Sequence, residues 1–185
     1  MGTIIKDIAE SNLNDIPEVC SYCIYWSFPE EFEKIKSELA KKKQELTAKK
    51  RLWILQTLKE FGSCGKILYH NNVPVGYAEY GPPHCFPRIN EYESQPIGKM
   101  EAGVVFLSCL YIADENFRGK GHGEKLLNNV VADLKRRGFK TVETYARKGS
   151  PENPSGPVEL YIKRGFYIKN KVNLEFPIVG LNLQS

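Results

Sequence analysis

The sequence lacks any hydrophobic run long enough to cross a membrane. Its most apolar stretch, Val104–Ile112, is nine residues long and is interrupted by Ser108, whereas a membrane-spanning helix needs about 20 residues. The N-terminal segment also lacks the apolar block of a secretory signal, because charged residues are spread through it: Lys6, Asp7, Glu10, Asp15 and Glu18. We therefore expect a cytoplasmic protein with no membrane partner.

Cysteine is scarce and odd in number. Five thiols in a chain without an export signal argue against a disulfide scaffold and favour reduced thiols. Cys20 and Cys23 have the spacing of half a zinc site, but neither a second pair nor a nearby histidine accompanies them. We expect an inert thiol pair on a helix and no bound metal.

Neither sign of charge is in large excess. Lys and Arg number 26 and Asp and Glu number 22, which gives a net charge of +4. This suits an anionic small ligand but falls short of the concentrated charge of a dedicated nucleic-acid-binding protein. We interpret the lysine-rich run 41–51 as a solvated helix face, and keep RNA binding through this helix as an alternative.

A length of 185 residues predicts one domain over residues 1–185, and the hydrophobic pattern predicts N-terminal helices within 1–62. Expected helices cover 7–26, 27 towards 61, 124–137 and 155–164, the last with Ser155 as its N-cap. Expected strands cover 66–70, 73–80, 104–112, 139–146, 166–169 and 172–179. Asn71-Asn72 forms a tight turn, and an irregular loop spans 81–98. This order predicts an α/β fold with a mixed central sheet flanked by helices.

Three glycines in five positions separate the strand 104–112 from the helix 124–137. The segment reads Arg118-Gly119-Lys120-Gly121-His122-Gly123. Glycines let the backbone approach a ligand, and the N–H groups at a helix N-terminus attract anions. We expect a seat for a phosphate or pyrophosphate, to which the amide of His122 contributes more than its ring. The Walker and dinucleotide-binding patterns do not fit, because His122 and Glu124 stand where they require lysine and glycine.

This segment resembles the acyl-CoA-binding loop of the GNAT superfamily of N-acetyltransferases, Arg/Gln-x-x-Gly-x-Gly/Ala. Arg118, Gly121 and Gly123 occupy its fixed positions. The resemblance implies a GNAT-like acyltransferase fold, acetyl-CoA as co-substrate, and loop amides that hold the CoA pyrophosphate. It also implies that the end of the preceding strand pairs with the pantetheine arm, through Leu110, Tyr111 and Ile112.

A second segment, Leu160-Tyr161-Ile162-Lys163-Arg164-Gly165-Phe166, is similar to the family's Leu-Tyr-x-Lys-x-Gly-Phe. Family members often carry an Asn seven residues before this tyrosine. Pro154 stands there in this chain, so Asn153 or Ser155 beside it would take the polar role. The resemblance covers 103–179, the expected acyl-CoA-binding core. It implies that Tyr161 is the acid that protonates the leaving thiolate, because a phenol of pKa near ~10 can protonate a thiolate of pKa near ~8.5.

The implied reaction also needs an oxyanion donor and a base. A backbone N–H near Leu110 would stabilise the oxyanion. A carboxylate would accept the amine proton, and the candidates are Glu79 and Glu143, between which the sequence does not choose.

The predicted function is direct transfer of an acetyl group from acetyl-CoA to a primary amine in a ternary complex. The acceptor would be a small-molecule or peptide amine, and the resemblance implies that it docks between the N-terminal helices and the loop 81–98. The alternative is a non-catalytic acyl-CoA-binding regulatory module. The oligomeric state is left open, with a homodimer as one option.

Overall fold

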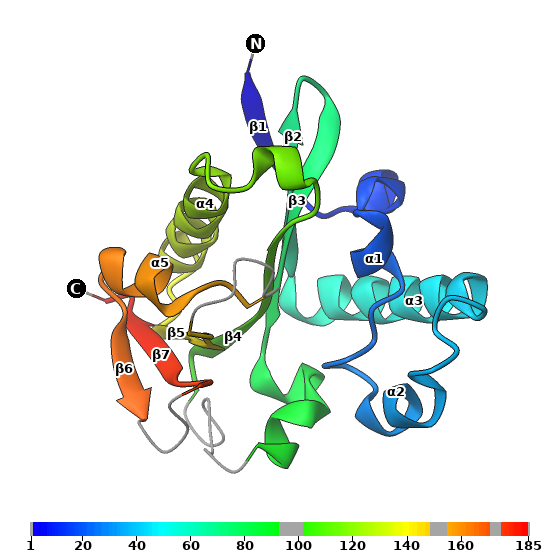
Figure 1. The fold of residues 1–185 in the computed structure, drawn as a ribbon. Coiled ribbons are helices and arrows are strands. Elements are labelled where there is room, and N and C mark those ends of the chain that lie inside the picture. Colours follow the sequence, from blue (N-terminus) through cyan, green and yellow to red (C-terminus); the bar gives the residue numbers. More distant parts are fainter. Residues whose placement is uncertain (1, 93–101, 149–154, 171–174, 185) are drawn as a thin grey trace.

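A seven-stranded mixed sheet forms the centre of the computed structural model, which describes residues 2–92, 102–148, 155–170 and 175–184 (Figure 1). Its strands are β1 (Thr3–Asp7), β2 (Gly65–His70), β3 (Val73–Gly81), β4 (Val104–Ile112), β5 (Thr141–Tyr145), β6 (Tyr167–Asn170) and β7 (Ile178–Asn182). Their order is β1-β2-β3-β4-β5-β7-β6, and the β4–β5 pair is parallel while the other pairs are antiparallel. The prediction of a mixed sheet flanked by helices is confirmed.

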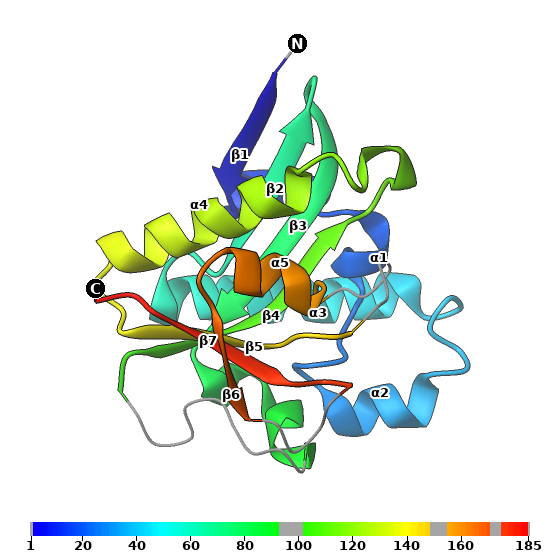
Figure 2. The ribbon, with the colours of Figure 1, turned by 60° about the vertical axis from the view of Figure 1, so that its left-hand side comes forward.

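Helices cover both faces of the sheet (Figures 1 and 2). The α-helices are α1 (Glu18–Ser21), α2 (Pro29–Ile35), α3 (Lys43–Phe61), α4 (His122–Arg136) and α5 (Val158–Lys163). Short 3-10 helices are η1 (Glu10–Asp15), η2 (Pro83–Cys85), η3 (Pro87–Glu91) and η4 (Glu115–Phe117). The first three α-helices lie on one face and α4 on the other.

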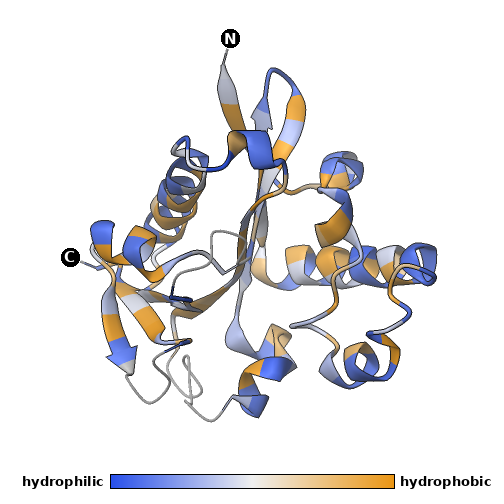
Figure 3. Ribbon diagram, in the orientation of Figure 1, coloured by the Kyte–Doolittle hydropathy of each residue, from blue (hydrophilic) through white to orange (hydrophobic). Residues whose placement is uncertain are grey.

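Side chains alternate between the two faces, as expected for strands. On β2, Ile67 and Tyr69 pack with Ile54 of α3, whereas Leu68 packs into the cluster that holds the apolar stripe of α4. Both helices mix hydrophilic and hydrophobic residues along their length (Figure 3). The sheet is therefore buried on both sides.

The N-terminal third departs from the sequence prediction. Residues 3–7 form β1, which pairs with β2, so the helix expected over 7–26 is wrong and is replaced by η1 and α1. The expected helical stretch from 27 to 61 divides into α2 and α3. β1 is only five residues long, and its burial pattern does not alternate cleanly, so periodicity gave no strand signal.

The C-terminal part needs two corrections. Ser155 is not the N-cap of α5, because that helix starts at Val158 and its N-cap is Pro157. The closing strand β7 lies at 178–182 rather than 172–179, and residues 171–174 are outside the described part. The Asn71-Asn72 turn is confirmed, since both residues have positive φ (50° and 66°), as the twist of a tight hairpin requires.

β4 and β5 separate part-way along the sheet. Their parallel pairing covers three residue pairs and ends at Phe106 and Glu143, whereas β4 continues to Ile112. The carbonyl of Leu107 instead accepts a hydrogen bond of 2.7 Å from the Thr144 hydroxyl. At the same point β4 carries a bulge, because Glu79 pairs with Cys109 and Tyr80 pairs with Leu107.

The bulge shifts the side-chain alternation of β4 by one residue. Val105 and Leu107 belong to the core cluster that includes α4, and so does Leu110. Ser108 and Cys109 therefore both face the side of the sheet that α3 covers.

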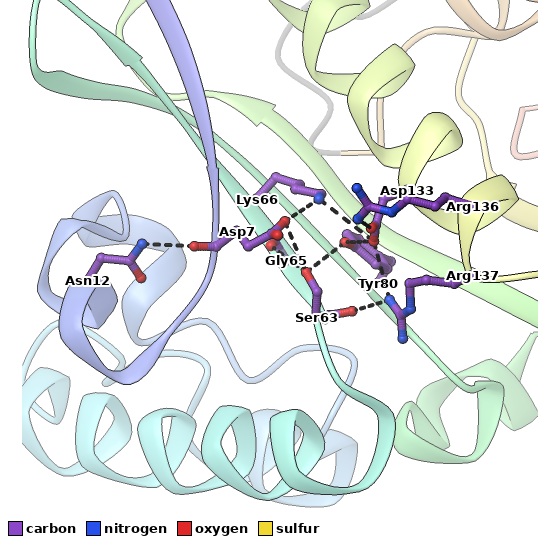
Figure 4. Close-up of polar contacts among 9 residues, drawn as sticks. All are labelled: Asp7, Asn12, Ser63, Gly65, Lys66, Tyr80, Asp133, Arg136 and Arg137. Atoms are coloured by element: carbon purple, nitrogen blue, oxygen red, sulfur yellow. Dashed lines mark hydrogen bonds and ion pairs between the residues drawn. The ribbon is translucent and has the colours of Figure 1, made fainter.

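Asp133 of α4 is the centre of a polar network that ties this helix to the sheet (Figure 4). Its carboxylate accepts hydrogen bonds from the Tyr80 hydroxyl (3.1 Å) and the Arg137 guanidinium (3.3 Å) and lies 3.7 Å from Lys66 Nζ. Arg137 also donates to the carbonyl of Ser63, 2.7 Å away. Asp133 and Lys66 are only 4% exposed, so each neutralises a charge that burial would otherwise penalise.

Asp133→Asn is expected to lower the free energy of unfolding by about 2 kcal/mol at neutral pH, because Arg137 and the buried ammonium of Lys66 lose this carboxylate while Asp7 still pairs with Lys66. Burial by itself raises the pKa of Asp133, but Lys66, Tyr80 and Arg137 together hold that pKa below its usual value. The contribution of the Asp133 carboxylate to the free energy of unfolding is thus complete above about pH 4, the pKa in the unfolded state. It is lost as the pH falls through the lower pKa of the folded state.

Urea denaturation at several pH values checks this, since the difference between wild type and variant should shrink from about pH 6 to about pH 3. Arg136→Gln is the control. Its side chain is 74% exposed, so its effect should stay below about 1 kcal/mol. A difference that is independent of pH would contradict the role of the Asp133 charge.

Candidate active site

The glycine-rich loop presents free backbone donors at the start of α4. Gly119 and Gly121 have positive φ (71° and 79°), and a Cβ at either position would meet nothing within 4 Å. Within the described residues, none of the N–H groups of residues 119–123 donates to another protein atom. The loop therefore offers a group of unpaired donors at the positive end of a 15-residue helix, as an anion site requires.

The side chains of Arg118 and His122 contact neighbouring elements and hold the loop in place. Arg118 donates from Nε to the carbonyl of Ile112 (3.0 Å) and from Nη2 to the Tyr111 hydroxyl (3.1 Å), so it ties the loop to the end of β4. The His122 ring is buried and packs against His70 and Phe117. Burial first, and then Lys125, His70 and Lys120, lower the pKa of His122. The backbone N–H of His122, and not its buried ring, is thus among the unpaired donors of the loop.

Among the described strands, none pairs with the end of β4 on the side of β5. Leu110, Tyr111 and Ile112 pair with β3 through residues 76–78, but the β4–β5 pairing has already ended at Phe106. The two strands diverge from this point (Figure 2). An extended chain can lie in such a gap and pair with β4, because no strand of the described residues pairs with β4 there.

A cavity of about 410 Å³ lies on the face of the sheet that carries the N-terminal helices. Its walls come from the segment 19–32, α3, β3, β4, the end of β5, Tyr92 of the loop 81–98, Ser155 and Phe176. Ser108 at the bulge lines it, and so do Cys109 and Tyr111 further along β4. The cavity thus reaches β4 where that strand has separated from β5.

A buried ion pair forms the polar part of this cavity. Lys50 of α3 and Glu79 of β3 are 3% and 4% exposed, and Lys50 Nζ lies 2.9 Å from Oε1 and 2.7 Å from Oε2 of Glu79. The Tyr77 hydroxyl donates to Oε2 (2.7 Å), and the Ser108 hydroxyl donates to Oε1 (3.0 Å). Each carboxylate oxygen therefore has two donors.

Lys50 remains charged in this setting. Burial by itself lowers the pKa of Lys50, but the attraction of the Glu79 carboxylate outweighs burial and leaves that pKa raised. The lysine also lies 4.4 Å from the centroid of the Trp53 ring. The prediction that the whole run 41–51 is a solvated helix face is thus wrong for Lys50, because a partner on β3 compensates its buried charge.

The structure separates the two candidate bases. Glu79 lines the cavity, whereas Glu143 is not among the lining residues and is ion-paired with Lys169. Glutamate side chains on strands are usually exposed to solvent. Glu79 and Glu143 are both buried instead, with exposed fractions of 4% and 1%.

Tyr161 is completely buried beside the cavity rather than exposed in it. Its hydroxyl donates to the carbonyl of Ser155, which does line the cavity, and its ring packs edge-to-face on Phe166. Gly156 has φ +81°, and a Cβ there would lie 3.1 Å from the Tyr161 hydroxyl oxygen. Burial raises the pKa of Tyr161, so this phenol is protonated at neutral pH. Asn153 lies outside the described residues.

Sequence reasoning missed several cavity residues. Lys50, Tyr77 and Ser108 were not singled out, because the ion pair joins residues 29 positions apart and the bulge that turns Ser108 inward has no sequence signal. Cys20 and Cys23 line the cavity as free thiols. Among the described residues, no group of three or more His, Cys, Asp or Glu side chains is arranged to hold a metal.

Comparison with known proteins settles the family. A model of the acetyltransferase (GNAT) family matches residues 22–166. The chain belongs to this GNAT family. No curated protein sequence matches it, and across the described residues no helix has the length and apolar character needed to cross a membrane.

Solved structures show the same GNAT fold. The PaiA N-acetyltransferase of Thermoplasma acidophilum, in complex with coenzyme A, is 17% identical with a TM-score of 0.61, over 98% of this chain and 99% of that chain. YncA of Salmonella typhimurium, a putative acetyltransferase with acetyl-CoA, is 16% identical with a TM-score of 0.64, over 99% and 95%. The ribosomal-protein-S18-alanine N-acetyltransferase of Escherichia coli is 13% identical with a TM-score of 0.56, over 100% and 96%.

Proposed function

We propose that this GNAT protein transfers an acetyl group from acetyl-CoA to a primary amine, directly and in a ternary complex. The observation that carries the proposal is the group of unpaired N–H donors at residues 119–123. They stand next to the strand end that β5 has left free, and the cavity opens against the same part of β4. One region therefore offers a seat for a diphosphate, an edge for an extended arm, and space for an acceptor.

In the proposed reaction the amine nitrogen attacks the thioester carbonyl carbon. The C–N bond forms, the C–S bond breaks, and CoA leaves as a thiolate. A backbone N–H near Leu110 would stabilise the oxyanion, since donors fixed before the reaction need no reorganisation. The pyrophosphate would be held by the amides of Gly119, Lys120, Gly121, His122 and Gly123, with Arg118 bracing the loop.

Gly121→Ala is expected to weaken CoA binding by about ten-fold or more. A non-glycine residue at φ +79° costs about 1–2 kcal/mol, and relief of this strain would turn the N–H donors away from the ligand. Gly138→Ala is a matched control, because Gly138 has the same φ of 79° and the same open surroundings, at the other end of α4. Calorimetry with CoA should show equal affinity for Gly138→Ala and wild type; equal losses in both variants would contradict the anion seat.

We assign the proton acid to Tyr161. Tyr161→Phe keeps the buried ring but removes the donor, so kcat should fall by about 100-fold while the affinity for acetyl-CoA stays within about two-fold. Thiol release and calorimetry measure the two quantities. Tyr167→Phe, half-exposed on β6, is the control and should leave both unchanged. An undiminished kcat in Tyr161→Phe would leave this tyrosine with a packing role only.

We assign the proton acceptor to Glu79, because it is the carboxylate that lines the cavity. Glu79→Gln keeps the shape of the side chain but cannot accept a proton, so kcat should fall by about 100-fold while the affinity for acetyl-CoA stays within about two-fold. Thiol release and calorimetry measure the two quantities. Glu31→Gln is the matched control, because Glu31 pairs with Lys49 outside the cavity and its loss should leave both values unchanged. A kcat that Glu79→Gln leaves unchanged would exclude Glu79 as the base.

A further inference from the structure

Half of the described residues that line the cavity are aromatic. Three of these rings, Trp26, Tyr92 and Tyr145, lie nearly parallel to one another. Their centroids are 4.4–5.7 Å apart and their planes differ by 6–26°. They come from three distant parts of the chain, and Tyr145 belongs to β5 at the gap beside β4. The rings together form an apolar wall of the cavity, which we call the ring wall.

The ring wall is held in place by a buried arginine behind it. Arg88 of η3 donates from Nε to the carbonyl of Tyr25 (2.6 Å) and from Nη2 to the Glu33 carboxylate (2.9 Å), and its guanidinium lies 4.0 Å from the Tyr25 ring centroid. The Tyr25 and Tyr92 hydroxyls are hydrogen-bonded at 2.7 Å. These contacts join the loop that carries Tyr92 to the N-terminal segment, so the wall is preformed rather than assembled by a ligand.

The cavity offers no surplus charge to an acceptor. Among the described residues that line it, Lys50 and Glu79 alone carry formal charges, and they neutralise each other. Both oxygens of Glu79 are already engaged by Lys50, Tyr77 and Ser108. A second ammonium group on an acceptor would find no free carboxylate, and an acceptor carboxylate would find no free cation. Burying either group unpaired is costly.

We propose that the acceptor is a small monoamine whose remaining part is aromatic, of the arylalkylamine class, with its ring packed on the ring wall. The inference rests on the proposed acetyl transfer and adds the substrate class. A cavity of about 410 Å³ accommodates a small molecule of this kind. Aromatic faces bind a ring by stacking and also attract the single ammonium group of the incoming amine before it loses its proton.

The transfer to such an amine is balanced without a further reactant. The ammonium group first releases one proton to solvent. The neutral amine nitrogen then forms a bond to the acetyl carbonyl carbon, the thioester C–S bond breaks, and the second proton lost by nitrogen ends on the CoA thiolate through the protein groups assigned above. The products are an N-acetyl arylalkylamine and free CoA, and nothing is oxidised or reduced.

The test compares four acceptors with the full-length protein and acetyl-CoA, with thiol release as the readout. The acceptors are 2-phenylethylamine, hexylamine, spermidine and an alanine-starting peptide. We expect kcat/KM for 2-phenylethylamine to exceed each of the other values at least about ten-fold. In parallel, calorimetry measures the binding of acetyl-CoA to the protein without an acceptor. This binding tests the proposed function separately from the choice of acceptor.

Tyr92→Leu tests the ring wall itself. Loss of one stacked ring should raise KM for 2-phenylethylamine by about two- to ten-fold, with less effect on hexylamine and none on acetyl-CoA affinity. Tyr167→Leu is the matched control, because it replaces an aromatic residue outside the cavity, and it should change none of these values.

The outcomes separate the two proposals. If acetyl-CoA does not bind, the proposed function fails. If acetyl-CoA binds but spermidine, hexylamine or the peptide is the better acceptor, or no amine is acetylated, the arylalkylamine inference is overturned and the cofactor site stands. If Tyr92→Leu leaves the preference for 2-phenylethylamine unchanged, the ring wall does not select the substrate.

Discussion

The separation of β4 from β5 is the constraint on which the rest of the site depends. If the parallel pairing continued to Ile112, β5 would satisfy the backbone hydrogen-bonding groups of β4 and no gap would separate the two strands. The pairing instead ends at Phe106 and Glu143. The bulge at Ser108 accompanies the separation and places two consecutive side chains on one face. Where β4 and β5 separate, the Thr144 hydroxyl donates a hydrogen bond to the Leu107 carbonyl. This side chain takes the place of the backbone N–H that a paired strand would supply.

Local signals in the sequence predicted much of the scaffold. β4 was predicted with its observed ends because a nine-residue apolar run buried on both faces has few other interpretations. The Asn71-Asn72 turn and the glycine loop before α4 were also predicted, since positive φ has a strong preference for these residue types. β1 was missed because its place in the sheet comes from pairing with β2, some 60 residues away, and not from its own pattern.

The candidate site was predicted less well than the scaffold. The loop and Glu79 carry local signals, a glycine motif and a strand end, whereas Lys50 looks like one more lysine in a basic helical run. Its burial depends on the register between α3 and β3, which no short window of sequence encodes. The ring wall could not be predicted from the sequence for the same reason, because Trp26, Tyr92 and Tyr145 come into contact only in the folded chain.

The buried pair of Lys50 and Glu79 also bears on how this domain would respond to selection for heat resistance. Replacing a buried ion pair by apolar side chains of similar volume is often neutral or stabilising. Laboratory evolution that rewards thermal resistance alone should therefore favour hydrophobic residues at these two positions. A lineage that retains both charges under such pressure has a use for them beyond holding α3 against the sheet.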